Sequence, residues 1–179
     1  MRLTIARAGV VVAALAVLGA AWAHGPTRQK VRESIEIYAP QAKVWAVIGN
    51  FQDMSWLAGV SKTEGEKGNE IGATRRLTLA PGVTIEEELS KYEPEMMSYS
   101  YRITAVDVKV LPVTNYSSTL EVSPAPGGKA KLEWSGAFYR GYPNNDPPPE
   151  LNDEAAIKAV SGLYKAGLEA LKKKIESGS

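Results

Sequence analysis

Hydrophobic and polar residues alternate along most of the chain, which is the pattern of strands with one buried face. The first such segment begins at Lys30, and Val31, Glu33, Ile35 and Ile37 fall on one side of it. Five more strands are predicted over residues 70–79, 83–92, 97–106, 115–122 and 131–139, and a weaker one over 60–64. Turn residues lie between them. Short connections of this kind predict an antiparallel meander, in a sheet of about seven strands.

Three segments have the period of helices instead. Pro40 can open a short helix that ends at Gly49-Asn50, and a second short helix is predicted over residues 51–57. Near the C-terminus, apolar residues recur at steps of three and four, which predicts one long helix with Asn152 as its N-cap. Its apolar stripe consists of Ile157, Val160, Tyr164, Leu168, Leu171 and Ile175.

A sheet with one apolar face and a helix with one apolar stripe bury these surfaces against each other. The sequence therefore predicts an α+β fold, in which a curved antiparallel sheet wraps around the long C-terminal helix. Strict alternation assigns the inner face to Leu77, Leu79, Val83, Ile85, Leu89, Tyr99, Tyr101, Ile103, Tyr116, Leu120, Val122, Leu132, Trp134 and Phe138. It also places two charged residues, Arg75 and Glu87, on that face.

Residues 1–23 have the pattern of a secretory signal peptide. Arg2 and Arg7 precede an uninterrupted apolar run, which ends in the small-x-small sequence Ala21-Trp22-Ala23. We therefore expect a single mature domain over residues 24–179. We also expect it to be exported to a bacterial periplasm, without stable insertion in the membrane after cleavage.

Composition narrows the possible functions. Removal of the signal peptide lowers the count of Lys and Arg from 21 to 19, against 20 Asp and Glu, so the mature charge is about −1. This balance argues against nucleic acid as a partner. The absence of cysteine excludes thiolate metal sites and thiol catalysis. The single histidine, His24, lies at the start of the mature chain, and no metal site or cofactor is predicted.

Arg75 and Glu87 form one candidate site. Neighbouring strands, a shared inner face and opposite charge would allow a bidentate ion pair. Because a buried ion pair is costly to desolvate, it invites a functional explanation as well as a structural one. The functional interpretation is an arginine that holds an acidic or carbonyl ligand and is positioned by Glu87. The structural interpretation is an ion pair at the rim of a cavity.

Aromatic residues form the rest of the candidate site. The predicted lining of a ligand cavity comprises Tyr99, Tyr101, Tyr116, Trp134, Phe138 and Tyr164, together with Arg75 and Glu87. Such a lining suits an apolar or planar ligand. The alternative is that these side chains fill the interior themselves. Trp56 is expected to be exposed near the cavity mouth, as a ligand lid or a protein contact.

The predicted order of elements resembles the helix-grip fold of the SRPBCC superfamily, which includes START, birch-pollen-allergen and polyketide-cyclase-like proteins. Several segments are similar to those of this superfamily: Val44-Trp45-Ala46-Val47-Ile48-Gly49-Asn50-Phe51, Gly72-Ala73-Thr74-Arg75, Glu133-Trp134-Ser135-Gly136-Ala137-Phe138 and Gly162-Leu163-Tyr164-Lys165-Ala166-Gly167-Leu168. Among its members, an exported chain without cysteine most resembles the MxaD-like periplasmic accessory proteins of bacterial methanol oxidation. That resemblance implies a non-enzymatic role in electron transfer from methanol dehydrogenase to its cytochrome c.

Three functions are therefore considered. The first is the accessory role, with methanol dehydrogenase and its cytochrome c as partners. The second is a periplasmic carrier of an apolar or aromatic small ligand. The third is an enzyme of cyclase or dehydratase type, with Glu87 as base and Arg75 as electrophile. A cavity large enough for a ligand would favour the second and third, whereas a filled core with an exposed aromatic patch would favour the first.

Overall fold

The computed structural model of the chain describes residues 25–80 and 82–178. The predicted signal peptide lies outside these residues, so its cleavage after Ala23 stays a prediction. In the described part of the chain, no helix combines the length and the apolar character that crossing a membrane requires.

One antiparallel sheet, with the strand order β1-β7-β6-β5-β4-β3-β2, contains all seven strands of the described residues. The strands are β1 (Gln29–Ile37), β2 (Lys62–Glu66), β3 (Thr74–Ala80), β4 (Val83–Glu93), β5 (Ser98–Val106), β6 (Val113–Ala125) and β7 (Lys129–Arg140). Strands β2 to β7 form the predicted meander, and β1 pairs with β7 at one edge. Because consecutive strands are neighbours, short turns suffice to join them.

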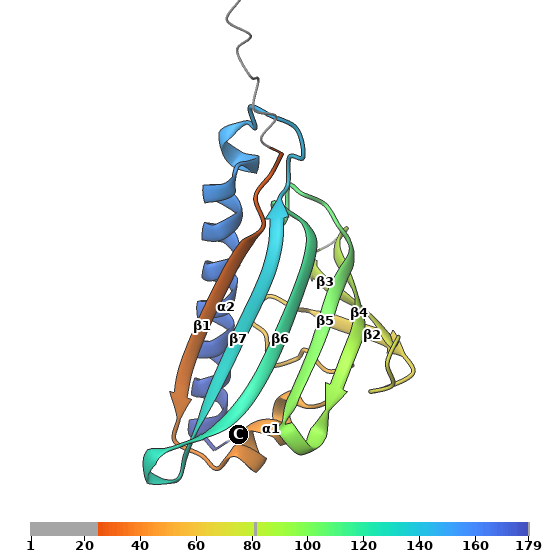
Figure 1. Cartoon of the computed structure of the whole chain (residues 1–179). Helices are drawn as coiled ribbons and strands as arrows, with labels where there is room; N and C mark the ends of the chain where they lie inside the picture. Colours follow the sequence, from red (N-terminus) through yellow and green to blue (C-terminus); the bar gives the residue numbers. More distant parts are fainter. Residues whose placement is uncertain (1–24, 81, 179) are drawn as a thin grey trace, which may run out of the picture.

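Among the residues that the structure describes, two α-helices accompany the sheet, α1 (Gln41–Ile48) and α2 (Asp153–Glu176). Helix α2 runs along the inner side of the sheet and packs on β1 and β7 (Figure 1). The Asn152 side chain accepts a hydrogen bond of 2.8 Å from the backbone N–H of Ala155, which confirms the predicted N-cap. The predicted α+β helix-grip fold is therefore confirmed. Short 3-10 turns, at Pro94–Met96, Pro126–Gly128 and Pro149–Leu151, complete the connections.

The predicted second short helix, over residues 51–57, is wrong. Turns occupy this segment, and its backbone bonds span three residues, as in Leu57 N–H to the Met54 carbonyl. Asn50 and Asp53 explain the difference, because each carboxamide or carboxylate oxygen accepts a bond from the backbone N–H two residues later. Such local bonds compete with helical ones.

Irregularities of the sheet set which side chains face inward. The pairing of β4 with β5 shifts between Glu86 and Glu87, and the pairing of β6 with β7 shifts around Asn115, whose φ is +47°. A bulge of this kind inserts a residue and re-aims its neighbours. As a result Val113 and Tyr116, three residues apart, are both buried.

The core lies between α2 and the inner face of the sheet. Burial confirms most of the predicted inner face and the α2 stripe, but Ile157 is 37% exposed and the neighbouring Ala156 is buried in its place. Tyr164 of α2 stacks on Trp134 of β7, with ring centroids 4.4 Å apart. This contact joins the helix to the centre of the candidate site.

Candidate functional site

Arg75 and Glu87 face each other across β3 and β4, and both are buried, with exposures of 1% and 5%. Arg75 Nε donates a hydrogen bond of 2.6 Å to Glu87 Oε2, and Nη1 donates one of 2.6 Å to the Phe51 carbonyl. The guanidinium also lies 4.1 Å from the Phe51 ring centroid and 4.9 Å from that of Tyr101. The predicted inward orientation of the pair is therefore confirmed.

Burial and charge act in opposite directions on this pair. Burial raises the pKa of Glu87, although the Arg75 charge opposes the shift. Burial acts to lower the pKa of Arg75, but the charge of Glu87, the neighbouring Tyr99 and Tyr101, and the hydrogen bond to Glu87 together outweigh it, so this pKa is raised. The ion pair gives both groups a counter-charge, which only partly offsets the cost of burying the carboxylate. We therefore assign the pair as ionised near neutral pH, with a carboxylate that is destabilised by its surroundings.

A chain of hydroxyl groups continues from this pair toward α2. Trp134 Nε1 donates to the Tyr101 hydroxyl at 3.2 Å and to Ser118 Oγ at 2.9 Å. The Tyr164 hydroxyl lies 2.8 Å from Ser118 Oγ and 2.6 Å from the Tyr116 hydroxyl. Burial raises the pKa of Tyr101 and Tyr116 well above their usual range, and that of Tyr164 to about 12. These tyrosines are therefore neutral hydrogen-bonding groups at neutral pH.

Two buried polar atoms lie at one end of the site. Within the described residues, neither Arg75 Nη2 nor the Tyr99 hydroxyl forms a hydrogen bond of good geometry, although the neighbouring Arg75 acts to lower the pKa of Tyr99 against the larger effect of burial. Such groups are costly to bury. They mark the end of the site that adjoins Phe51, whose ring packs edge-on against Tyr99.

A small cavity with a volume of about 40 Å³ lies in the interior at this site. Glu87, Tyr101, Tyr116 and Trp134 line it, together with aliphatic side chains that include Met54, Leu57, Leu111 and Leu163. A space of this size holds about one water molecule rather than a larger ligand. Hence side chains fill most of the interior, and only four of the eight predicted lining residues touch the remaining cavity.

The other four predicted residues are not among the side chains that line the cavity: Arg75, Tyr99, Phe138 and Tyr164. Phe138 stacks on Tyr116, and Tyr164 stacks on Trp134, so two of them contact the lining from outside. The predicted exposure of Trp56 is wrong, since this side chain is only 3% exposed and packs edge-on against Trp134 at 5.7 Å. The turns over residues 51–57 fold the indole into the core.

Ser118 and the Phe51 carbonyl are the parts of the site that the sequence analysis missed. Ser118 follows the same alternation as Tyr116 and Leu120, so a small polar residue at an inward position was a usable signal. The Phe51 carbonyl carries no such signal, because a turn exposes it to Arg75. In the portion of the chain that the structure describes, no cluster of three or more His, Cys, Asp or Glu residues could hold a metal ion.

The fold and its polar core define a helix-grip protein with a closed interior. Residues 28–176 match the model of the family described as polyketide cyclase / dehydrase and lipid transport, and the chain belongs to this family. The superfamily predicted from the sequence is thereby confirmed. Comparison with curated proteins gives no significant match.

Solved structures agree with this assignment. An uncharacterized protein from Bacillus thuringiensis is 30% identical, with a TM-score of 0.70, over 83% of this chain and 99% of its own. The protein XoxI from Bacillus cereus is also 30% identical, with a TM-score of 0.70, over 82% and 95%. Norcoclaurine synthase from Thalictrum flavum is 16% identical, with a TM-score of 0.65, over 95% and 99%, and shares the fold.

Proposed function

We propose that the protein binds a small, mainly apolar or aromatic molecule that donates a hydrogen bond to Glu87. The observation that carries this proposal is a buried carboxylate on the wall of an otherwise mostly apolar cavity. Among the described residues, hydrogen bonds reach only one oxygen of Glu87, Oε2, so its other oxygen can accept a bond from a ligand. Membership of a family that includes lipid-transport proteins supports a binding role.

Binding requires the cavity to enlarge. Met54 and Leu57 lie in the turns that follow α1, and Leu111 precedes β6, so three of the eight aliphatic residues that line the cavity come from loops. Loops rearrange more readily than paired strands, and methionine adapts to irregular space. A ligand would therefore enter by displacing this wall while Glu87 and Trp134 stay in place.

We propose binding rather than catalysis, because Arg75 is turned away from the cavity. Its donors reach Glu87 and the Phe51 carbonyl, and it does not line the cavity. An electrophile has to reach the reacting group. The cyclase or dehydratase mechanism with Arg75 as electrophile therefore has less support than a carrier.

Titration with phenol, followed by tryptophan fluorescence, tests the proposal. Phenol should bind and toluene should bind less tightly, because only phenol donates a hydrogen bond. Glu87→Gln should reduce this preference, and the outward-facing Glu86→Gln is the matched control. Leu163→Phe should block binding by filling the cavity. Equal affinity for phenol and toluene, or binding that survives Leu163→Phe, would contradict the proposal.

The accessory role in methanol oxidation is the second candidate, and the small interior cavity favours it. Tyr38 is 70% exposed and lies between two lysines, with its ring centroid 4.4 Å from Lys129 Nζ and 5.5 Å from Lys172 Nζ. An exposed aromatic residue suits a protein contact, because tyrosine is enriched at interfaces. On this proposal the periplasmic mature chain, beginning at His24, contacts methanol dehydrogenase or its cytochrome c through Tyr38.

A cytochrome c reduction assay tests this second candidate. Addition of the protein should raise the rate of cytochrome c reduction by methanol dehydrogenase, without turnover of methanol by the protein alone. Tyr38→Ala should weaken the effect, whereas Ile71→Ala, which removes an equally exposed side chain, should not. The near-neutral mature charge predicts a modest dependence on salt. No change in rate over a wide concentration range would eliminate the accessory role.

A further inference from the structure

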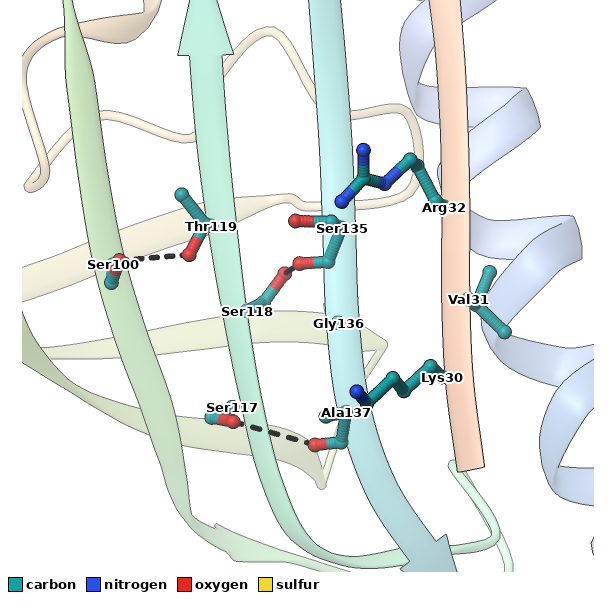
Figure 2. A pocket seen from close by; sticks show the side chains of 10 residues that line it. All are labelled: Lys30, Val31, Arg32, Ser100, Ser117, Ser118, Thr119, Ser135, Gly136 and Ala137. Carbon is teal, nitrogen blue, oxygen red and sulfur yellow. Dashed lines mark hydrogen bonds between the residues drawn. The ribbon is translucent and has the colours of Figure 1, made fainter. Parts of the chain in front are cut away.

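A groove of about 420 Å³ lies on the outer face of the sheet, opposite the core. Its floor is formed by β5, β6 and β7, and the edge strand β1 forms one wall (Figure 2). The hollow exists because the outward side chains of the floor are short: Ser100, Ser117, Thr119, Ser135 and Ala137. A groove of this volume is large enough for a small organic ligand.

Strand register arranges the outward residues in two rows across the sheet. One row runs Arg32, Ser135, Thr119, Ser100, and the next runs Lys30, Ala137, Ser117, Arg102. Neighbouring strands are about 4.8 Å apart, so hydroxyl groups follow one another at a spacing that a single ligand can span. Cationic residues stand at the β1 end of both rows.

The cations of the β1 side reach over the floor. Figure 2 shows the side chains of Lys30 and Arg32 extending from β1 across β7, toward Ala137 and Ser135. Arg28 reaches farther and donates a hydrogen bond of 3.2 Å to Ser117 Oγ. Three positive side chains at alternate positions thus converge on one side of the groove.

Some of these cationic and hydroxyl groups have no partner among the described residues. Arg32 contacts Glu133 at 3.2 Å, but Lys30 has no hydrogen bond or ion pair with any residue of the described chain. Ser100 and Thr119 bond each other at 2.8 Å, whereas the Ser135 hydroxyl bonds no other described residue. Like charges in this proximity repel each other unless an anion lies between them.

We infer that this groove binds a small organic anion, whose carboxylate or phosphate group lies between Lys30 and Arg32 and accepts a hydrogen bond from Ser135. The remainder of the ligand would lie on the floor formed by Ala137 and Ser117. Charged donors form the strongest hydrogen bonds to such groups, and the hydroxyls add direction.

The neighbouring row limits the size of the anion. It runs Ser34, Glu133, Glu121, Ser98, and its two carboxylates border the groove on the Arg32 side. An extended polyanion such as nucleic acid would meet these carboxylates and be repelled. A compact anion confined to the two rows of the groove would not.

Isothermal titration with citrate and with inorganic phosphate, at constant ionic strength, tests this inference. At least one should bind, and the tighter one distinguishes a carboxylate site from a phosphate site. The double variant Lys30→Gln/Arg32→Gln should weaken binding about tenfold or more, since it removes two charge-assisted contacts. The matched control Lys62→Gln/Arg76→Gln removes the same charge from β2 and β3 and should bind like the wild type.

A third variant tests whether anion binding depends on the shape of the groove or only on the positive charge of the surface. Ala137→Leu leaves every charge in place but fills the floor, so it should also weaken binding about tenfold. The inference is overturned if neither anion binds, if the two double variants weaken binding equally, or if Ala137→Leu binds like the wild type. Circular dichroism on each variant establishes that it is folded.

Discussion

The Tyr164 hydroxyl occupies the space in which a side chain at Gly136 would lie. Gly136 belongs to β7, directly between Trp134, which stacks on Tyr164, and Phe138. The absence of a Cβ therefore lets the hydroxyl reach Ser118 and Tyr116. A glycine in the middle of a strand is here a requirement of the polar core.

Gly136→Ala should therefore destabilise the protein. The added methyl group forces Tyr164 out of its hydrogen bonds, and overpacking of this kind costs about 1–3 kcal/mol. Urea denaturation measures the change. In the double variant with Tyr164→Phe the two losses should be less than additive, because Phe lacks the clashing hydroxyl. Strict additivity would mean that the alanine is accommodated elsewhere.

The contribution of the Arg75–Glu87 pair to the stability of the protein should require both partners. Arg75→Met or Glu87→Leu alone leaves an uncompensated buried charge, and each should lower the free energy of unfolding by about 3–5 kcal/mol. The double variant should recover much of that loss. The adjacent pair Arg76–Glu86, with side chains 58% and 42% exposed, is the control and should contribute at most about 1 kcal/mol. Single variants that unfold like the wild type would contradict the burial of the pair.

Glu87 should also make the stability of the protein decrease as the pH rises. Burial raises its pKa above the ordinary value of 4.5, so the folded state binds this proton more tightly than the unfolded state does. The stabilisation is then fully present below pH 4.5 and is lost as the pH rises through the raised pKa of the folded state. Urea titrations of wild type and Glu87→Gln, from about pH 4 to pH 9, measure this. The wild type should lose stability relative to the variant as pH increases, and a gain would reverse the assigned shift.

Substitution of alanine for two glycines of α2 should change the stability of the protein in opposite directions. A Cβ at Gly162 would meet no side chain or neighbouring element within 4 Å, so Gly162→Ala should stabilise the helix by about 0.5–1 kcal/mol. At Gly167 a Cβ would lie 2.7 Å from Leu57 Cδ1 and 2.8 Å from Trp134 Cζ3. Gly167→Ala should therefore destabilise the protein by about 1–3 kcal/mol, despite its better helix propensity. Thermal unfolding of the two variants compares them directly, and equal shifts would show that α2 is not closely packed at Gly167.

The sequence by itself determined the elements whose pattern is local. The alternation of β3 and β4 placed Arg75 and Glu87 on the inner face, and the stripe of α2 identified the surface that packs on the sheet. Asn152 as N-cap is a local signal of the same kind, because the cap and its N–H partner are three residues apart. Periods and caps are properties of neighbouring residues, and a sequence displays them directly.

Only the tertiary structure decided what those faces enclose. Side-chain hydrogen bonds of Asn50 and Asp53 produce turns where the sequence predicted a helix. These turns bury Trp56, and they present the Phe51 carbonyl as a hydrogen-bond acceptor for Arg75. Whether the aromatic interior is open or filled depends on how closely α2 approaches the sheet, which the contact of Gly167 with Trp134 allows. The outer groove likewise depends on register, because Lys30 and Ser117 line the same groove only when β1, β7 and β6 are aligned. These relationships join residues far apart in the chain, and packing between elements fixes them in a way that no local pattern records.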